Sequence, residues 1–172
     1  MTEKLNHFQH YLKELYEKEK WNEYHAFTNS NFLLEELGEL AEECLHPKKE
    51  SDITGELGDI LQALLAVANH YNVPVSSLSY ELKLVTEEWE TCFIRFTLSL
   101  GLLAREIRRQ EIGRHSHEQT ESMTTNEKRE KLIQTLTHTF HSLDTFCLKV
   151  NVSFDDIIEE NMKKMKRKYP LS

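Results

Sequence analysis

Residues that make tight turns are scarce in this chain. It has 5 glycines and 3 prolines among 172 residues, well below average usage. A fold of many short strands joined by tight turns is therefore disfavoured, whereas long helices need few such residues. Apolar residues recur at helical spacing along most of the chain, and no segment alternates convincingly between apolar and polar residues. The sequence predicts an all-α fold, a helical bundle.

A few clear breaks separate the predicted helices. Pro47 and Pro74 each end a helix, because proline cannot continue the hydrogen-bond ladder. Residues 113–126 are polar and form the one convincing long loop of the sequence. The helices are expected at about 2–20, 31–45, from Ser51 or Asp52 to about 71, from Ser76 or Ser77 onward, from after Thr91 to Gln110, 127–149 and 154–168.

Charge and cysteine content limit the partners and the compartment. The net charge of −8, from 29 acidic and 21 basic residues, argues against a general nucleic-acid-binding surface. Three cysteines lie far apart without CxxC spacing, which favours a reducing compartment. The charged N-terminus has no apolar signal core, and the most apolar stretch, 93–104, contains Arg95 and is too short to span a membrane. We expect a soluble, cytoplasmic protein with no membrane partner.

Two segments of the chain repeat. The pattern Leu-Gly-x-Leu-Ala-x-Glu occurs at 37–43 and again at 100–106, an offset of 63, and residues 72–78 resemble 151–157 at an offset of 79. The similarity between these segments has two explanations: a duplication within the chain, or the likeness that leucine-rich helices often show without one. The interpretation we adopt is a single domain, 1–172, of two related helical-hairpin units: about 1–90 and a degenerate unit of about 91–172.

Two matched pentads carry the strongest functional signal. They are Glu36-Leu37-Gly38-Glu39-Leu40 and Glu56-Leu57-Gly58-Asp59-Ile60. Within each pentad the two acids lie roughly 60° apart on the helix surface, beside the apolar stripe. An antiparallel hairpin of the two helices can bring the four carboxylates to one edge. The glycine between each pair of acids would let a ligand or another backbone come close.

Carboxylates gathered at the edge of a core repel one another unless a cation neutralises them. Oxygen ligands select a hard ion such as Mg²⁺ or Mn²⁺. Such ions bridge phosphate oxygens and activate bound water, so the pattern predicts metal-assisted hydrolysis of a phosphate compound. The alternative is an ordinary solvated glutamate face.

These acids also carry a family resemblance. Glu35-Glu36-x-x-Glu39, followed after 16 residues by Glu56-x-x-Asp59, resembles the EExxE…ExxD signature of the MazG-like all-α NTP pyrophosphohydrolases. That superfamily includes the dimeric dUTPases and the phosphoribosyl-ATP pyrophosphohydrolases. The resemblance covers about residues 28–90. The tail Asn161-x-x-Lys164…Lys168-Tyr169-Pro170 is similar to the family's N-x-x-K…R-Y-P run, with Lys168 where arginine is usual.

The resemblance implies an enzyme that uses Mg²⁺ to cleave (d)NTPs between the α and β phosphates, giving a monophosphate and pyrophosphate, with house-cleaning of nucleotide pools as its role. It implies Glu36, Glu39, Glu56 and Asp59 as metal ligands. Glu35 would help by orienting the attacking water or a second metal ion. A dUTP- or dCTP-specific pyrophosphatase and a non-catalytic helical interaction protein remain alternatives.

The second unit lacks the acids. At the two offsets, Glu36, Glu39, Glu56 and Asp59 correspond to Ser99, Leu102, Thr135 and His138. The resemblance implies dimers or tetramers with pockets between subunits. Our hypothesis is a pseudo-dimer within one chain, in which the second unit replaces a partner and walls the pocket of the first. A homodimer of such chains remains possible.

Further residues are candidates for binding the nucleotide. Trp21 can stack on a base, and Lys48 and Lys83 can meet phosphate oxygens. The alternatives are a core tryptophan and ordinary solvated lysines. The histidine pairs His115-x-His117 and His138-x-x-His141 are interpreted as surface or packing residues, although His138 would touch substrate if the pseudo-dimer is correct.

Overall fold

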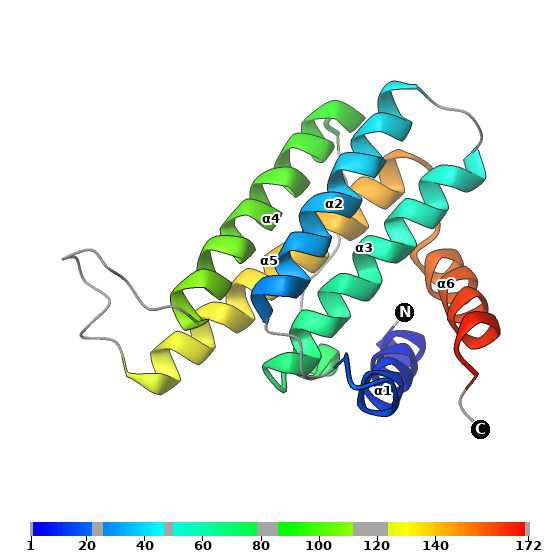
Figure 1. Ribbon diagram of the computed structural model, residues 1–172. Coiled ribbons are helices and arrows are strands. Elements are labelled where there is room, and N and C mark those ends of the chain that lie inside the picture. Colours follow the sequence, from blue (N-terminus) through cyan, green and yellow to red (C-terminus); the bar gives the residue numbers. More distant parts are fainter. Residues whose placement is uncertain (1, 22–25, 47–49, 79–85, 112–123, 171–172) are drawn as a thin grey trace.

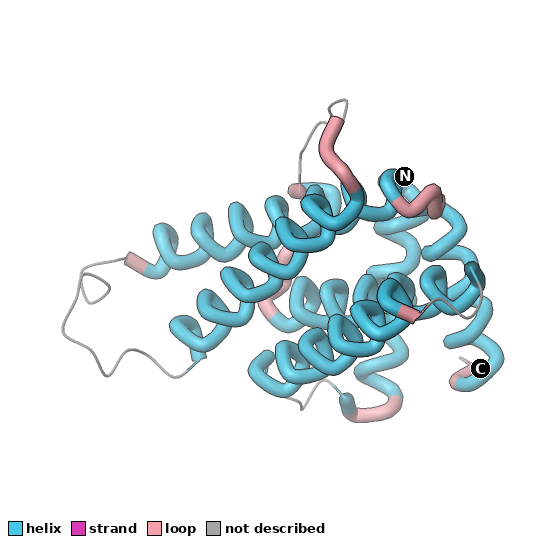
Figure 2. Tube along the Cα trace, turned by 90° about the horizontal axis from the view of Figure 1, so that it is seen from above, coloured by secondary structure: helices cyan, strands magenta, loops and turns pink. Residues whose placement is uncertain are grey.

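The computed structural model describes residues 2–21, 26–46, 50–78, 86–111 and 124–170. Within these ranges every regular element is a helix and there is no strand (Figures 1 and 2). The elements are α1 (Thr2–Lys18), α2 (Ala26–Leu45), α3 (Glu50–His70), the 3-10 helix η2 (Val75–Ser77), α4 (Trp89–Glu111), α5 (Thr125–Lys149) and α6 (Phe154–Lys168). The predicted all-α fold is confirmed.

Two helical hairpins form the body of the protein. Helix α2 packs against α3, α4 packs against α5, and the hairpins meet where α2 contacts α4 (Figure 1). Helices α1 and α6 both pack against α3 and against each other, so the two ends of the chain lie close together. The Tyr11 hydroxyl donates to the Tyr169 carbonyl at 3.1 Å, and the Lys18 ammonium donates to the Pro170 carbonyl at 2.6 Å.

Helix α3 lies at the centre of these contacts, and its sequence explains why. Its second half, from Ile60 to Ala68, is apolar on nearly all sides, which is the pattern of a helix surrounded by others. Most of these side chains are fully buried, because α1, α2 and α6 each cover part of the helix. No helix in the described part of the chain combines the length and apolarity needed to cross a membrane.

The helix boundaries differ from the prediction in two places. Helix α2 begins at Ala26 and not near Asn31. Asn29 and Ser30, which precede the predicted start, are both buried within the first turns of the helix. The helix predicted from Ser76 or Ser77 is wrong at its start, because Val75–Ser77 form a 3-10 helix that ends in extended backbone at Leu78. Residues 79–85 lie outside the described ranges.

The turns that follow α3 and α5 have the same local structure. Asn72 and Asn151 both adopt the left-handed conformation, with φ of 51° and 57°. In each turn, the next N–H reaches back to a carbonyl five residues earlier, from Val73 to Ala68 at 2.8 Å and from Val152 to Cys147 at 2.9 Å. This is the hydrogen bond of a Schellman motif. Equivalent residues are 79 apart, the offset of the repeat in the sequence.

Candidate active site

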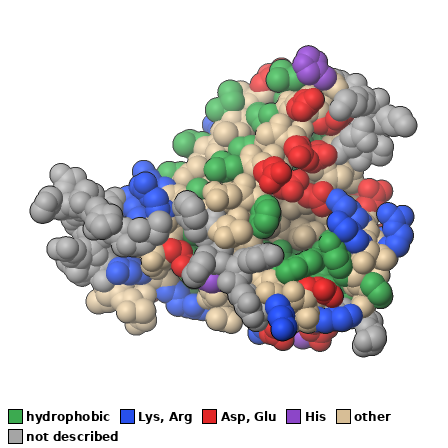
Figure 3. Space-filling view, viewed as in Figure 1, with side chains coloured by type: hydrophobic (Ala, Val, Ile, Leu, Met, Phe, Trp, Pro, Cys, Tyr) green, Lys and Arg blue, Asp and Glu red, His purple; other side chains and the backbone are tan. Residues whose placement is uncertain are grey.

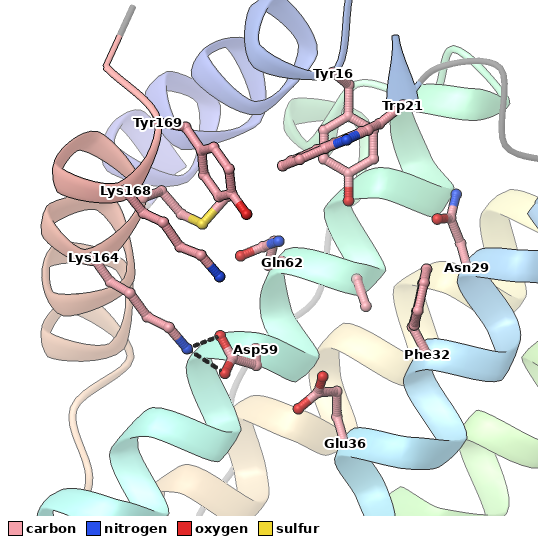
Figure 4. A pocket seen from close by; sticks show the side chains of 12 residues that line it. Tyr16, Trp21, Asn29, Phe32, Glu36, Asp59, Gln62, Lys164, Lys168 and Tyr169 are labelled. Atoms are coloured by element: carbon pink, nitrogen blue, oxygen red, sulfur yellow. Dashed lines mark hydrogen bonds and ion pairs between the residues drawn. The ribbon is translucent and has the colours of Figure 1, made fainter. Parts of the chain in front are cut away.

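The acidic pentads meet across the α2–α3 hairpin. Glu36 on α2 and Glu56 and Asp59 on α3 are half-buried, and one oxygen of each lies within 4.8 Å of the others. Figure 4 shows Glu36 and Asp59 directed toward each other from the two helices. Acidic side chains gather on the face of the molecule seen in Figure 3, with basic side chains beside them. The apolar residues beside each acid pack the hairpin and hold the acids at its edge.

The other two predicted acids lie at different distances from this group. In an antiparallel hairpin, Glu36 lies opposite Asp59 and Glu39 lies opposite Glu56. The largest charge effect on Glu36 comes from Asp59, and that on Glu56 comes from Glu39, as this register requires. Glu39 is exposed and borders the group of three. Glu35 is also exposed, about 100° farther round the helix than Glu36, and lies outside the group.

The group is short of positive charge. Burial, followed by the charges of Asp59, Glu39 and Glu56, raises the pKa of Glu36 to about 7. Burial and the same kind of repulsion raise the pKa of Glu56, whose Oε2 atom is buried without a hydrogen-bond partner. Lys164 lowers both pKa values, so it offsets part of the repulsion. The arrangement favours binding of a cation.

Helix α6 supplies the groups that hold Asp59. The Lys164 ammonium lies 2.7 Å from Oδ1 and 2.5 Å from Oδ2 of this carboxylate, and Asn161 Nδ2 donates to Oδ1 at 3.0 Å. Glycine at position 58 permits this approach, because a Cβ atom there would lie 2.9 Å from Asn161 Nδ2. A Cβ atom on Gly38, in contrast, would have no neighbour within 4 Å among the described residues.

A cavity of about 400 Å³ opens beside these carboxylates. Aromatic rings lie at one end of it and charged groups at the other (Figure 4). At the aromatic end, Trp21 contacts Tyr16 and Tyr169 edge to face, with ring centroids 5.4 Å and 4.8 Å apart. The cavity is lined by Tyr16, Trp21, Asn29, Phe32, Glu36, Asp59, Gln62, Ala63, Lys164, Met165, Lys168 and Tyr169.

The structure places the remaining candidates as follows. Trp21 lines the cavity, whereas Lys48 and Lys83 lie outside the described residues, as do His115 and His117. His138 lines a different cavity, between α4 and α5. Within the described chain, the wall that residues 91–172 contribute to the acidic cavity comes from α6 and not from the α4–α5 hairpin.

Several residues that line the cavity beside the carboxylates were not predicted from the sequence as site residues. Asn29 and Phe32 lie seven and four residues before Glu36, and Gln62 lies three residues after Asp59, so each continues an acidic helix face along its axis. This helical spacing from the acids is the sequence signal that indicates these three residues. For Lys164, the signal was the Asn-x-x-Lys spacing of the tail, which puts two donors on one face of α6.

Comparison with known proteins agrees with this geometry. Residues 26–79 match the family model described as the MazG nucleotide pyrophosphohydrolase domain. This segment of the chain is similar to a MazG domain. The matched segment holds α2, α3 and all the clustered carboxylates, so the resemblance stated from the acidic motif is confirmed. The match indicates a hydrolase of nucleotide pyrophosphate bonds in general.

A curated relative matches part of the chain. The chain is 29% identical to the uncharacterized protein YvdC of Bacillus subtilis (strain 168) over 83 residues, which covers 40% of this chain and 78% of YvdC. No solved structure matches the chain.

The three clustered carboxylates suit a divalent metal ion. Oxygens bound to one Mg²⁺ at about 2.0–2.1 Å lie within roughly 4.2 Å of one another, close to the spacing of the three carboxylates here. Oε2 of Glu56 is buried and has no hydrogen-bond partner among the described residues, so it is available to bind such an ion. An all-oxygen set favours a hard ion.

Proposed function

We propose that this protein is a Mg²⁺-dependent nucleoside triphosphate pyrophosphohydrolase. It cleaves (d)NTPs between the α and β phosphates and releases a nucleoside monophosphate and pyrophosphate. The observation that carries the proposal is the cluster of three half-buried carboxylates, with one unpartnered oxygen, at the charged end of a cavity whose other end is aromatic. Mn²⁺ can replace Mg²⁺ in such a set of ligands.

The carboxylates hold the metal. Glu36, Glu56 and Asp59 are the proposed ligands, and Glu39 completes the set from its position opposite Glu56. Bound there, the ion supplies Lewis-acid stabilisation of the phosphate charge and lowers the pKa of a bound water. Glu35 keeps its proposed role of orienting the attacking water or a second ion. Asn161 and Lys164 fix the orientation of Asp59 from α6.

The remaining lining residues position the nucleotide. Lys164 and Lys168 extend from α6 toward the charged end of the cavity, where phosphate oxygens would lie (Figure 4). Lys48 and Lys83 stay candidates for the same task. At the other end, Trp21 offers a ring on which a base can stack. The side-chain amides of Asn29 and Gln62 are available to hydrogen-bond the edge of the base.

The second unit contributes a wall to the cavity through α6. Residues from α1, α2, α3 and α6 enclose the cavity within one chain, which supports the pseudo-dimer proposal. A homodimer of such chains is compatible with a pseudo-dimer within each chain. House-cleaning of cytoplasmic nucleotide pools is the physiological role we propose, because the base end of the cavity combines aromatic rings with adaptable amides.

The test is pyrophosphate release from a panel of standard, deoxy and modified NTPs, with and without Mg²⁺. We expect release that requires Mg²⁺ and is abolished by Glu39→Gln or Asp59→Asn at unchanged helicity. Glu90→Gln, the same charge change at an exposed position on α4, should leave the rate unchanged. Strong preference for dUTP or dCTP would narrow the substrate class. No release from a folded protein that binds Mg²⁺ would overturn the proposal in favour of a non-catalytic helical protein.

A further inference from the structure

The second hairpin has a cavity of its own. It has a volume of about 310 Å³ and lies between α4 and α5. Its lining residues are Cys92, Arg95, Leu98, His138, His141, Ser142 and Thr145. None of them lines the cavity beside the carboxylates of the first hairpin, so the two cavities are separate in the described structure.

The two cavities occupy equivalent places in the two hairpins. Residues of α2 and α4 correspond at an offset of 63, and residues of α3 and α5 correspond at an offset of 79. At these offsets, six of the seven lining residues match residues of the first hairpin that line the cavity beside the carboxylates or the cavity that adjoins it at Trp21. The pairs are Asn29 with Cys92, Phe32 with Arg95, Asp59 with His138, Gln62 with His141, Ala63 with Ser142, and Ala66 with Thr145. The matching turns after α3 and α5 fix the second offset independently.

The second cavity has basic side chains where the first has an acidic and an aromatic one. His138 stands where the first hairpin has Asp59, and Arg95 stands where it has Phe32. Ser99 replaces Glu36 and is buried, with its hydroxyl donating to the Phe96 carbonyl at 2.7 Å. The groove has thus lost its carboxylates and gained a guanidinium and two imidazoles. It can attract an anion directly, whereas the first groove needs a metal ion to do so.

The neighbouring charges leave the guanidinium accessible. Arg95 pairs with Glu87 at 2.5 Å, but its side chain is 63% exposed and Glu87 is 33% exposed. An exposed pair of this kind contributes little, so an anion can compete with Glu87. Lys149 adds a second positive charge near Cys92.

A hydroxyl in the cavity wall has no partner. Thr145 Oγ1 is buried and makes no hydrogen bond to any described group. Most helical threonines bond the carbonyl four residues earlier, as Thr135 and Thr137 do here. Phosphate oxygens accept hydrogen bonds from hydroxyl, imidazole and guanidinium groups alike. The second cavity therefore has donors of three kinds among its lining residues.

We propose that the α4–α5 hairpin binds a small phosphate-bearing anion without a metal ion, in the cavity that corresponds to the active site of the first hairpin. The volume suits pyrophosphate or a nucleoside monophosphate. Arg95 and His138 are the principal contacts, with Thr145 and Ser142 in the wall. The site holds its ligand and does not hydrolyse it, because none of the described residues that line it is a carboxylate that could bind a metal ion. The proposal does not depend on the activity of the first hairpin.

The experiment is a calorimetric titration of the full chain in EDTA, where turnover is absent. One arm uses inorganic pyrophosphate and the other a nucleoside monophosphate, so that the two sources of phosphate are distinguished. We expect saturable binding in at least one arm, with shifts of the His138 and His141 ring signals in ¹H–¹⁵N spectra. Arg95→Gln should weaken binding about tenfold or more, because it removes a charged donor.

Matched variants distinguish binding at this site from binding in the cavity beside the carboxylates. Arg105→Gln removes the same charge from an exposed position on α4 outside the cavity and should leave binding unchanged. Glu87→Gln removes the competing carboxylate and should tighten binding, a gain that general destabilisation does not produce. The proposal is overturned if neither ligand binds at millimolar concentration, if Arg95→Gln and Arg105→Gln behave alike, or if Lys168→Gln abolishes the binding instead.

Discussion

Replacing Gly58 by alanine tests how closely α6 is held against the acidic hairpin. Alanine in a helix interior is favoured over glycine by about 0.8–1.0 kcal/mol. Gly55, on the same helix, has no neighbour within 4 Å of an added Cβ, so Gly55→Ala should gain this amount in full. At Gly58 the new Cβ would lie 2.9 Å from Asn161 Nδ2 and 3.2 Å from its Cβ, so Asn161 must move.

The cost of that movement exceeds the gain. Asn161 is buried and donates to the Asp59 carboxylate at 3.0 Å. A hydrogen bond to a charged group contributes about 1.5–3 kcal/mol. Loss of this bond, less the propensity gain, leaves Gly58→Ala about 0.5–2 kcal/mol less stable than the wild type. For a chain of this size each kcal/mol changes the unfolding temperature by about 2–4 °C.

Thermal unfolding of four variants measures the effect. Gly55→Ala should unfold a few degrees above the wild type, and Gly58→Ala should unfold below it. In an Asn161→Ala background, Gly58→Ala should no longer be destabilising and should recover part of the gain of Gly55→Ala, because the amide at 2.9 Å is gone and only the Cβ contact at 3.2 Å remains. Equal stabilisation by Gly55→Ala and Gly58→Ala in the wild-type background would refute the reasoning.

Three further predictions concern the metal, the base and the capping of α5. Mg²⁺ at 100 times its Kd should stabilise the protein by about 2.7 kcal/mol. Calorimetry should show that Glu56→Gln abolishes this gain. In EDTA the same variant should unfold at a higher temperature than the wild type, because one repelling charge is removed. Trp21→Ala should raise KM for the nucleotide roughly tenfold with a smaller change in kcat, since the ring lies at the cavity end away from the carboxylates, and steady-state kinetics checks it. The pKa of Glu127 is lowered by its hydrogen bonds from the backbone and hydroxyl of Thr124. Its stabilising effect is therefore present above the ordinary glutamate pKa and lost as pH falls through the lowered one, so the deficit of Glu127→Ala in thermal unfolding should shrink with acidification.

Local sequence patterns predict the helices and the acidic hairpin well. Helical periodicity and the prolines at 47 and 74 place most of the helices within a few residues, because both features act within one or two turns. The acids at 36 and 59 meet because the connection is short and the hairpin is antiparallel. Both conditions are visible in the sequence, so this part of the site follows from local rules.

Long-range packing supplies what the sequence patterns miss. Asn161 and Lys164 reach Asp59 across 102 and 105 residues of chain. The spacing of the tail indicates that these two side chains share a face of α6, but only the packing of α6 on α3 shows what that face meets. The early start of α2 is missed for a similar reason, because Asn29 and Ser30 are polar residues that tertiary contacts bury.

The symmetric pentads predict four equivalent acids, and the structure distinguishes them. Glu36 and Asp59 lie toward the cavity, whereas Glu39 lies nearer the exposed edge. The difference comes from α6, which covers the hairpin beside Asp59 and encloses one side of the cavity. A pattern confined to two helices contains no information about a third.

The most direct test of the central proposal is ³¹P NMR of a dNTP incubated with the protein and Mg²⁺. Cleavage between the α and β phosphates should give resonances of a nucleoside monophosphate and pyrophosphate in equal amounts. The same resonances should be absent with Glu56→Gln or in EDTA. Orthophosphate with a diphosphate, or an unchanged triphosphate in the presence of folded, Mg²⁺-bound protein, would contradict the account.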